Sequence, residues 1–368
     1  MTKKKINIEK DLTQLARIAL TARPQDVQAL IHRMARQYRD QKPKVADSLL
    51  SLLQESPTRA SPLRRQSEMP VPVDGDSRLN LIRIEGNPTL DQIPIYDHDV
   101  ETILSQIVAE RSNPEVLRKA GIEPTKSVIF TGPPGVGKTM AARWLAIELK
   151  LPLLTLDLAA VMSSYLGRTG TNLRHVLDYA KGFDCVLLLD ELDAIAKKRD
   201  DGGEIGELKR LVTVLIQEID DWPSTGLLVA ATNHPDLLDP AIWRRFEALI
   251  EFPLPDSDAI SKFVKSELKD QMDSSDTWAS LLGIALTGQS LSEVERDILS
   301  AKRSAIVHGT DLDDSLLSLM KIGDHSKSEK IELASQLVLS GLLSQRGAQE
   351  LTGVARETIR SRVKKQKA

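Results

Sequence analysis

A short glycine-rich segment carries the clearest chemical signal in the chain. Residues 132–139 read GPPGVGKT, which matches the phosphate-binding pattern GxxxxGK[ST], and they directly follow the apolar run Ser127–Phe130. Glycines allow successive backbone N–H groups to turn toward an anion, and a helix that begins near Lys138 adds the positive end of its dipole. The lysine suits the β- and γ-phosphates of a nucleotide, and the Thr139 hydroxyl suits Mg²⁺. We predict a nucleoside triphosphate site built from Gly132, Pro133, Pro134, Gly135, Val136, Gly137, Lys138, Thr139 and Met140.

Two adjacent carboxylates follow a second apolar run, Val186–Leu189. At the end of a buried strand, Asp190 would join Thr139 in holding Mg²⁺, and Glu191 would orient and polarise an attacking water. The alternative is an acidic helix cap without a catalytic role. Because the pair accompanies a phosphate-binding pattern in the same region, we favour hydrolysis.

The elements that must position these residues are visible in the surrounding pattern. Apolar runs at Ser127–Phe130, Leu153–Asp157, Val186–Leu189 and Leu227–Ala231 alternate with helical periodicity, which is typical of buried parallel strands with helices on both faces. We predict an α/β fold, a parallel-sheet P-loop core with a helical lid, flanked by small all-α regions. The predicted parts are an N-terminal helical domain at 1–55, a linker at 56–78, the core at 79–256, the lid at 257–311 and a C-terminal helical domain at 312–368.

The composition limits the class of protein. The chain has 368 residues, 41% of them apolar, and a formal net charge of −3, so the chain as a whole is not expected to coat nucleic acid or membrane. No apolar run approaches the roughly 18 residues of a membrane span. The lysine-rich start leads into no apolar signal core. A single cysteine, Cys185, excludes an internal disulfide. We expect a cytoplasmic protein.

A third motif, AATNHPDLLDPA at Ala230–Ala241, completes a set that resembles the AAA+ family of ATPases. It is similar to the second region of homology of the AAA subgroup, where the asparagine at the strand tip, here Asn233, is called sensor 1. The following IWRRFE is similar to the compact arginine-finger segment of the branch that includes katanin and spastin. The resemblance implies ATP as the nucleotide. It also implies that Arg244 and Arg245 reach the γ-phosphate of a neighbouring subunit and join Glu191 as catalytic residues.

The resemblance has consequences for assembly and substrate. An arginine supplied by a neighbour implies a cyclic assembly, and the family suggests a hexamer. Between the two phosphate-site motifs, the segment with Tyr165, Leu166 and Gly167 resembles the pore loop with which AAA rings grip a threaded polypeptide; otherwise Tyr165 simply packs in a loop. The likeness extends over about residues 79–309. The likeness has two departures. The usual Arg-Pro-Gly-Arg stretch is shortened, so the resemblance leaves open which of Arg244 and Arg245 is the dominant arginine finger. No sensor-2 arginine is evident.

The C-terminal segment from Ser344 to Val363 has the pattern of a helix-turn-helix with a glycine turn at Gly353. The second predicted helix is strongly basic, which suits contacts with DNA phosphates and bases. A capping bundle or a protein-docking module accounts for the pattern equally well. The candidate DNA contacts are Arg356, Arg360 and Arg362.

Three functions remain open at this point. The first is an ATP-driven remodeller or unfoldase of protein substrates. Since no peptidase motif is present, any proteolysis would come from a separate partner such as a protease. The second is a DNA-associated ATPase placed by the C-terminal segment. The third is a nucleotide-gated scaffold with negligible hydrolysis, and Glu191, Asn233 and the arginine pair argue against it.

Overall fold

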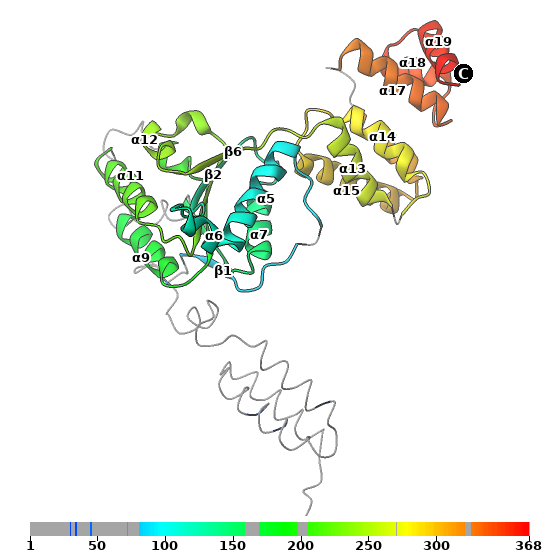
Figure 1. The fold of residues 1–368 in the computed structure, drawn as a ribbon. Helices are drawn as coiled ribbons and strands as arrows, with labels where there is room; N and C mark the ends of the chain where they lie inside the picture. The colour runs from blue at the N-terminus through cyan, green and yellow to red at the C-terminus, as the bar shows by residue number, and fades with distance from the viewer. Residues whose placement is uncertain are drawn as a thin grey trace, which may run out of the picture. The chain divides into compact units, whose positions relative to one another are not determined.

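The protein is described as a computed structural model. The described residues are 81–90, 92–158, 169–197, 205–269, 271–320 and 325–367, together with Leu30, Met34, Val45 and Pro72. The chain divides into two units, Met1–Pro70 and Val71–Ala368, and nearly all described residues belong to the second (Figure 1). The predicted N-terminal domain and linker lie almost wholly outside the described residues, and all domain boundaries stay predictions.

A six-stranded sheet forms the centre of the core, with strand order β1-β3-β4-β5-β2-β6. All neighbouring pairs are parallel except β1 and β3. Strands β2, β4 and β5 are almost entirely buried, as expected for apolar strands between two helical layers. The strands are β1 (Arg83–Glu85), β2 (Ser127–Thr131), β3 (Leu153–Asp157), β4 (Val186–Asp190), β5 (Leu227–Thr232) and β6 (Ala248–Glu251).

Helices cover both faces of this sheet (Figure 1). Because side chains alternate along a strand, Leu187 and Leu189 of β4 pack in the cluster with α9 and α11, whereas Val186 and Leu188 pack in the cluster with α5 and α7. The α/β fold class is thereby confirmed. The helical elements of the core are α5 (His98–Ser112), α6 (Pro114–Lys119), α7 (Lys138–Glu148), α9 (Thr169–Lys181), α10 (Ala194–Lys197), α11 (Ile205–Asp220), η2 (Pro235–Leu237) and α12 (Pro240–Trp243).

The four predicted strands are present at the predicted places, and the structure adds β1 and β6 at the two edges of the sheet. Both edge strands are short and partly exposed, so they lack the continuous apolar run that marks the central strands. β6 is nevertheless important for the site, because it leads directly into the segment Phe252–Asp256 that connects core and lid.

The lid is a helical bundle around the buried Trp278. Its helices have clear start signals: the Asp256 carboxylate accepts from the Ala259 N–H at 2.7 Å, and Ser290 and Glu293 form a reciprocal capping box. Leu316, which lies in the helix α16 (Leu312–Leu317), packs in the same cluster. The cluster includes the helices α13 (Ser257–Leu268), α14 (Ser275–Ala285), α15 (Leu291–His308) and α16 (Leu312–Leu317), of which α16 begins just after the predicted end of the lid.

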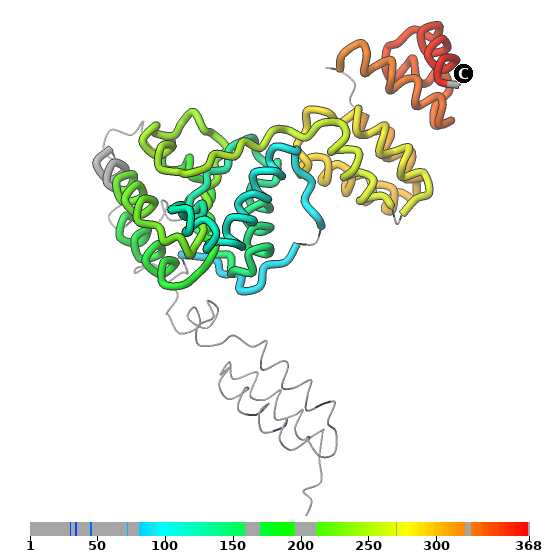
Figure 2. The backbone as a smooth tube through the Cα atoms, in the orientation of Figure 1, coloured from blue at the N-terminus to red at the C-terminus, as the bar shows by residue number. Residues whose placement is uncertain are grey.

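Three further helices end the chain: α17 (Lys327–Leu339), α18 (Gln345–Thr352) and α19 (Arg356–Lys367) (Figure 2). α17 contributes Leu333 and Leu337 to the apolar cluster of the lid. Gly353 caps the end of α18, and its φ of 72° permits the tight left-handed turn before α19. None of the described helices is both long and apolar enough to cross a membrane.

Candidate nucleotide site

The glycine-rich segment is a loop between β2 and α7 whose backbone only glycine can adopt without strain. Gly132, Gly135 and Gly137 have φ values of 137°, 79° and 96°. Neighbouring residues also leave no room for side chains. A β-carbon on Gly132 would lie 2.2 Å from the Phe252 carbonyl oxygen, and one on Gly135 would lie 2.6 Å from the Ser290 hydroxyl oxygen. No side chain caps the start of α7, which leaves its first N–H groups for an anion.

Lys138 is the cation of this loop and is largely buried. Its ammonium donates to the carbonyl oxygens of Gly132 and Pro133 and to Oδ1 of Asn233, each at 2.7 Å. Burial lowers the pKa of Lys138 from 10.5 to about 8, against the opposing effect of the carboxylates of Asp190 and Asp193. The predicted sensor 1 residue and the predicted phosphate-binding lysine are therefore in direct contact.

Thr139, in the first turn of α7, lies beside Asp190, the last residue of β4. The Thr139 hydroxyl lies 3.1 Å from Oδ2 of Asp190, and both residues follow or end parallel strands of the same sheet. One hydroxyl and one carboxylate fit Mg²⁺, which keeps several waters and takes its other ligands from phosphates. Among the described residues, no group of three or more His, Cys, Asp or Glu side chains could hold a metal ion by itself. The donor set therefore suits a metal that arrives with a nucleotide.

Glu191 lies at the turn after β4 with an unusual backbone. Its φ of 54° is in the left-handed region, which costs a non-glycine residue about 1–2 kcal/mol. Its N–H donates to Oδ1 of Asp190 at 2.9 Å, and its side chain is exposed. Glu191 therefore occupies a strained turn directly after Asp190, whose Oδ2 lies beside the Thr139 hydroxyl.

Asp193 is a buried carboxylate that the sequence reading missed. Its Oδ1 accepts from the Thr232 hydroxyl at 3.2 Å and from the Asn233 N–H at 3.4 Å, which joins the turn after β4 to the tip of β5. A signal was present in the sequence: an acidic residue stands among apolar neighbours in the segment Leu192–Ile195. Its partners are distant in sequence, so the pattern alone could not identify them.

The two arginines differ in their surroundings. Arg245 pairs with Asp220 at the end of α11, with Nη1 2.8 Å from Oδ2. Both arginines are exposed, but within the described part of the chain Arg244 has no ion pair or side-chain hydrogen bond. No such contact joins either arginine to the described glycine-rich loop. Within the described part of one subunit, neither predicted catalytic arginine is therefore bonded to the phosphate-binding loop.

A pocket of about 200 Å³ adjoins the loop at Gly135, Gly137 and Met140. The lid closes part of it, because the Ser292 N–H at the start of α15 donates to the Gly135 carbonyl at 3.3 Å. The Gln92 amide also donates to the Glu267 carboxylate and so joins the core segment before α5 to the lid. The pocket suits the apolar faces of a nucleotide base. Its large apolar lining residues are Leu90, Ile93, Ile95, Tyr96, Met140, Phe263 and Leu291.

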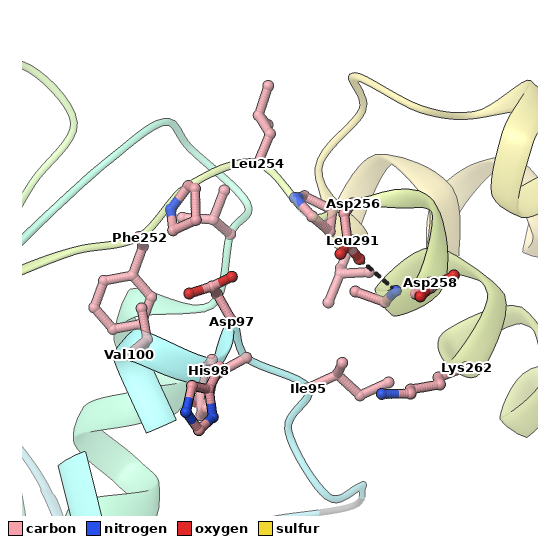
Figure 3. Close-up of a pocket in the computed structure, with 15 residues that line it drawn as sticks. Ile95, Asp97, His98, Val100, Phe252, Leu254, Asp256, Asp258, Lys262 and Leu291 are labelled. Carbon is pink, nitrogen blue, oxygen red and sulfur yellow. Dashed lines mark hydrogen bonds between the residues drawn. The ribbon is translucent and has the colours of Figure 1, made fainter. Parts of the chain in front are cut away.

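A second cavity of about 370 Å³ lies at the connection between core and lid (Figure 3). Asp97, from the core, lies on one side, and Asp256, Asp258 and Lys262 lie on the lid side. Asp97 and Asp256 cap the starts of α5 and α13. Capping therefore accounts for two of the three acidic side chains around this cavity.

The remaining predicted site residues belong to the pore loop and to the C-terminal helices. The predicted pore-loop residues Tyr165, Leu166 and Gly167 lie outside the described residues. In the C-terminal helices, Nη2 of Arg362 lies 2.8 Å from the Glu332 carboxylate, Nε of Arg356 donates to Gln349 at 2.9 Å, and Arg360 is exposed.

The sheet, the loop and the carboxylate pair together define a P-loop nucleoside triphosphatase. The family model of the ATPase family associated with various cellular activities (AAA) matches residues 128–254. The "Uncharacterized AAA family ATPase y4kL" of Sinorhizobium fredii is 34% identical over 295 residues, which cover 79% of this chain and 87% of that protein. The chain belongs to the AAA family and is an ATPase.

More distant relatives are similar over the ATPase region. A proteasome-activating nucleotidase of Methanococcus maripaludis is 34% identical over 205 residues, 53% of this chain and 50% of that protein. The 26S proteasome regulatory subunit S10B homolog B of Arabidopsis thaliana is 31% identical over 187 residues, 49% of this chain and 47% of that protein. The chain thus spans about half the length of each of these two relatives.

Proposed function

We propose that this ATPase drives the remodelling or unfolding of protein substrates through the pore of a ring. The observation that carries the proposal is the similarity, over the ATPase region, to proteins named for activating or regulating proteasomes. A separate partner such as a protease would then act on the unfolded product.

In the proposed hydrolysis, each residue of the site has one task. Lys138 and the backbone N–H groups of the loop bind the phosphates, and Thr139 and Asp190 hold Mg²⁺. The metal supplies charge neutralisation on the phosphate oxygens when it is bound. Glu191 orients and polarises the attacking water, and Asn233 places that water against the γ-phosphate. The pocket beside Met140 receives the base.

We assign the proposed trans contact to Arg244. Arg245 already has a partner in its own subunit, Asp220, whereas Arg244 has no ion pair or side-chain hydrogen bond among the described residues. An arginine from a neighbour would complete the charge stabilisation at the γ-phosphate, which accounts for a cyclic assembly, with a hexamer as the expected form.

The proposed function is tested with a folded model substrate that carries a recognition segment for this ATPase. The Glu191→Gln variant is expected to bind ATP without turning it over, so it should retain substrates and partners that can be identified by capture. The wild-type protein should then unfold a substrate captured in this way when ATP is present. The Tyr165→Ala variant should lose this unfolding activity while it retains ATP binding. If Tyr165→Ala unfolds the substrate at the full rate, threading through the pore is wrong.

Binding of duplex DNA by the C-terminal helices is the second candidate. Its support is the turn at Gly353 and the exposed basic side chains of α19, among them Arg360 and Lys364. Salt-dependent binding to duplex DNA that is lost in Arg356→Ala/Arg360→Ala would favour it. An absence of binding at low salt would exclude it.

A further inference from the structure

The buried carboxylate of Asp193 connects two parts of the site that are far apart in sequence. Asp193 is only 3% exposed. A buried carboxylate is unfavourable unless hydrogen bonds compensate for the loss of water, and here Thr232 and the Asn233 backbone provide them. Thr232 is itself buried at the end of β5, so the contact is shielded from solvent. The contact therefore fixes the turn after β4 against the tip of the neighbouring strand.

A backbone contact reinforces this connection. The Leu192 N–H donates to the Ala231 carbonyl at 2.9 Å, one residue before each partner of the Asp193–Thr232 pair. Glu191 directly precedes these two contacts and has the left-handed backbone described above. Strain of this kind persists only where surrounding contacts compensate for it. The long-range contacts of Leu192 and Asp193 follow Glu191 directly in the chain and help to hold its conformation.

We propose that Asp193 is a positioning residue for ATP hydrolysis, which acts through Thr232 and Asn233 and sets the placement of Glu191 relative to Asn233. The inference rests on the hydrolytic roles proposed above for Glu191 and Asn233. Asn233 in turn accepts from the Lys138 ammonium at 2.7 Å, so a continuous series of contacts runs from Asp193 to the phosphate-binding loop. A displacement of the β5 tip would reach both the water-polarising carboxylate and the lysine.

The experiment compares turnover with nucleotide affinity in the full-length protein. Asp193→Ala is expected to lower kcat by about 10²-fold, the loss that a small misplacement of reacting groups produces, while the dissociation constant for ATP changes little. Asp193→Asn keeps an oxygen acceptor for Thr232 and should recover most of kcat. Thr232→Val keeps the side-chain volume and removes the hydroxyl, so it should also lower kcat. It serves as the test if Asp193→Ala does not fold.

Glu218→Ala is the matched control, because Glu218 is a buried carboxylate paired with Lys181 away from the site.

Action through Asn233 is tested by a double variant. If Asp193 acts in part through the Asn233 side chain, Asp193→Ala should lower kcat less in an Asn233→Ala background than in the wild type, whereas independent roles would multiply the two losses. The inference is overturned if Asp193→Ala keeps wild-type kcat, if its losses in kcat and stability match those of Glu218→Ala, or if the losses multiply. The Glu191→Gln variant distinguishes failure of the proposed function from failure of this inference. ATP turnover by Glu191→Gln would contradict the proposed function. If Glu191→Gln is inactive and Asp193→Ala is fully active, only the role of Asp193 is contradicted.

Discussion

The hydroxyl oxygen of Thr139 lies 3.1 Å from Oδ2 of Asp190, although 51 positions separate the two residues in the sequence. This contact places one neutral and one charged oxygen ligand side by side, beside the loop that we propose binds phosphates. Such a pair suits Mg²⁺, which binds few protein ligands and retains phosphate oxygens and water.

Removing either oxygen should therefore affect the metal requirement. Thr139→Val and Asp190→Asn are expected to raise the Mg²⁺ concentration needed for half-maximal ATPase activity by about tenfold or more, because each removes or weakens a ligand. Thr139→Ser retains the hydroxyl and is the control, with an expected Mg²⁺ requirement close to wild type. A magnesium titration of the ATPase rate measures this. An unchanged requirement in Asp190→Asn would contradict the assignment of Asp190 as a metal ligand.

Gly135→Ala should impair nucleotide binding without unfolding the protein. The new methyl group would meet the Ser290 hydroxyl at the start of α15, and the φ of 79° would cost about 1–2 kcal/mol in any case. An affinity loss of about tenfold corresponds to 1.4 kcal/mol of this strain. Gly170→Ala is the control, since Gly170 lies in α9 with free space around it and a backbone that suits alanine. Titration with a fluorescent ATP analogue and thermal melting distinguish the two variants, and equal affinities would refute the close fit between loop and lid.

The ATPase rate should depend on Arg244 and not on the ion pair of Arg245, and subunit mixing should show that Arg244 acts on a neighbouring subunit. Arg244→Ala is expected to lower the ATPase rate by about 10³-fold or more, the loss seen when a trans arginine is absent. Adding Lys138→Ala subunits, which carry Arg244 but cannot bind phosphate normally, should restore part of the activity. Asp220→Ala frees Arg245 from its half-exposed ion pair, worth at most about 1 kcal/mol, and should leave the rate nearly unchanged. A lack of recovery on mixing would argue against a shared active site.

Nucleotide affinity should decline in alkaline solution. Burial lowers the pKa of Lys138 to about 8, so the nucleotide-free protein holds the protonated lysine below that pH and loses the charge above it. Since the protonated form attracts phosphate, affinity should be highest below about pH 8 and fall by up to about tenfold per pH unit above it. Lys138→Met should bind weakly with little pH dependence over this range. A decline of the same size in Lys138→Met would show that another group is responsible.

Much of this protein is determined by its sequence alone. The loop at Gly132–Thr139, the central strands and the carboxylate pair were predictable, because each depends on residues that are close together in the chain: glycines at a fixed spacing, an apolar run that both helical layers bury, and acidic residues at its end. The edge strands β1 and β6 were not, since half-exposed segments of three or four residues lack such a run.

Tertiary structure alone decided which of these residues touch. The sequence contains Asp193, Thr232, Asp220 and Arg245, but their pairing depends on strand order and on where each helix ends. The requirement for glycine at Gly135 likewise combines a local backbone angle with the distant Ser290. Local pattern reflects the forces that form each helix and strand, whereas contacts between distant residues arise only when those elements pack, and the contacts that position a catalytic group are mostly of the second kind.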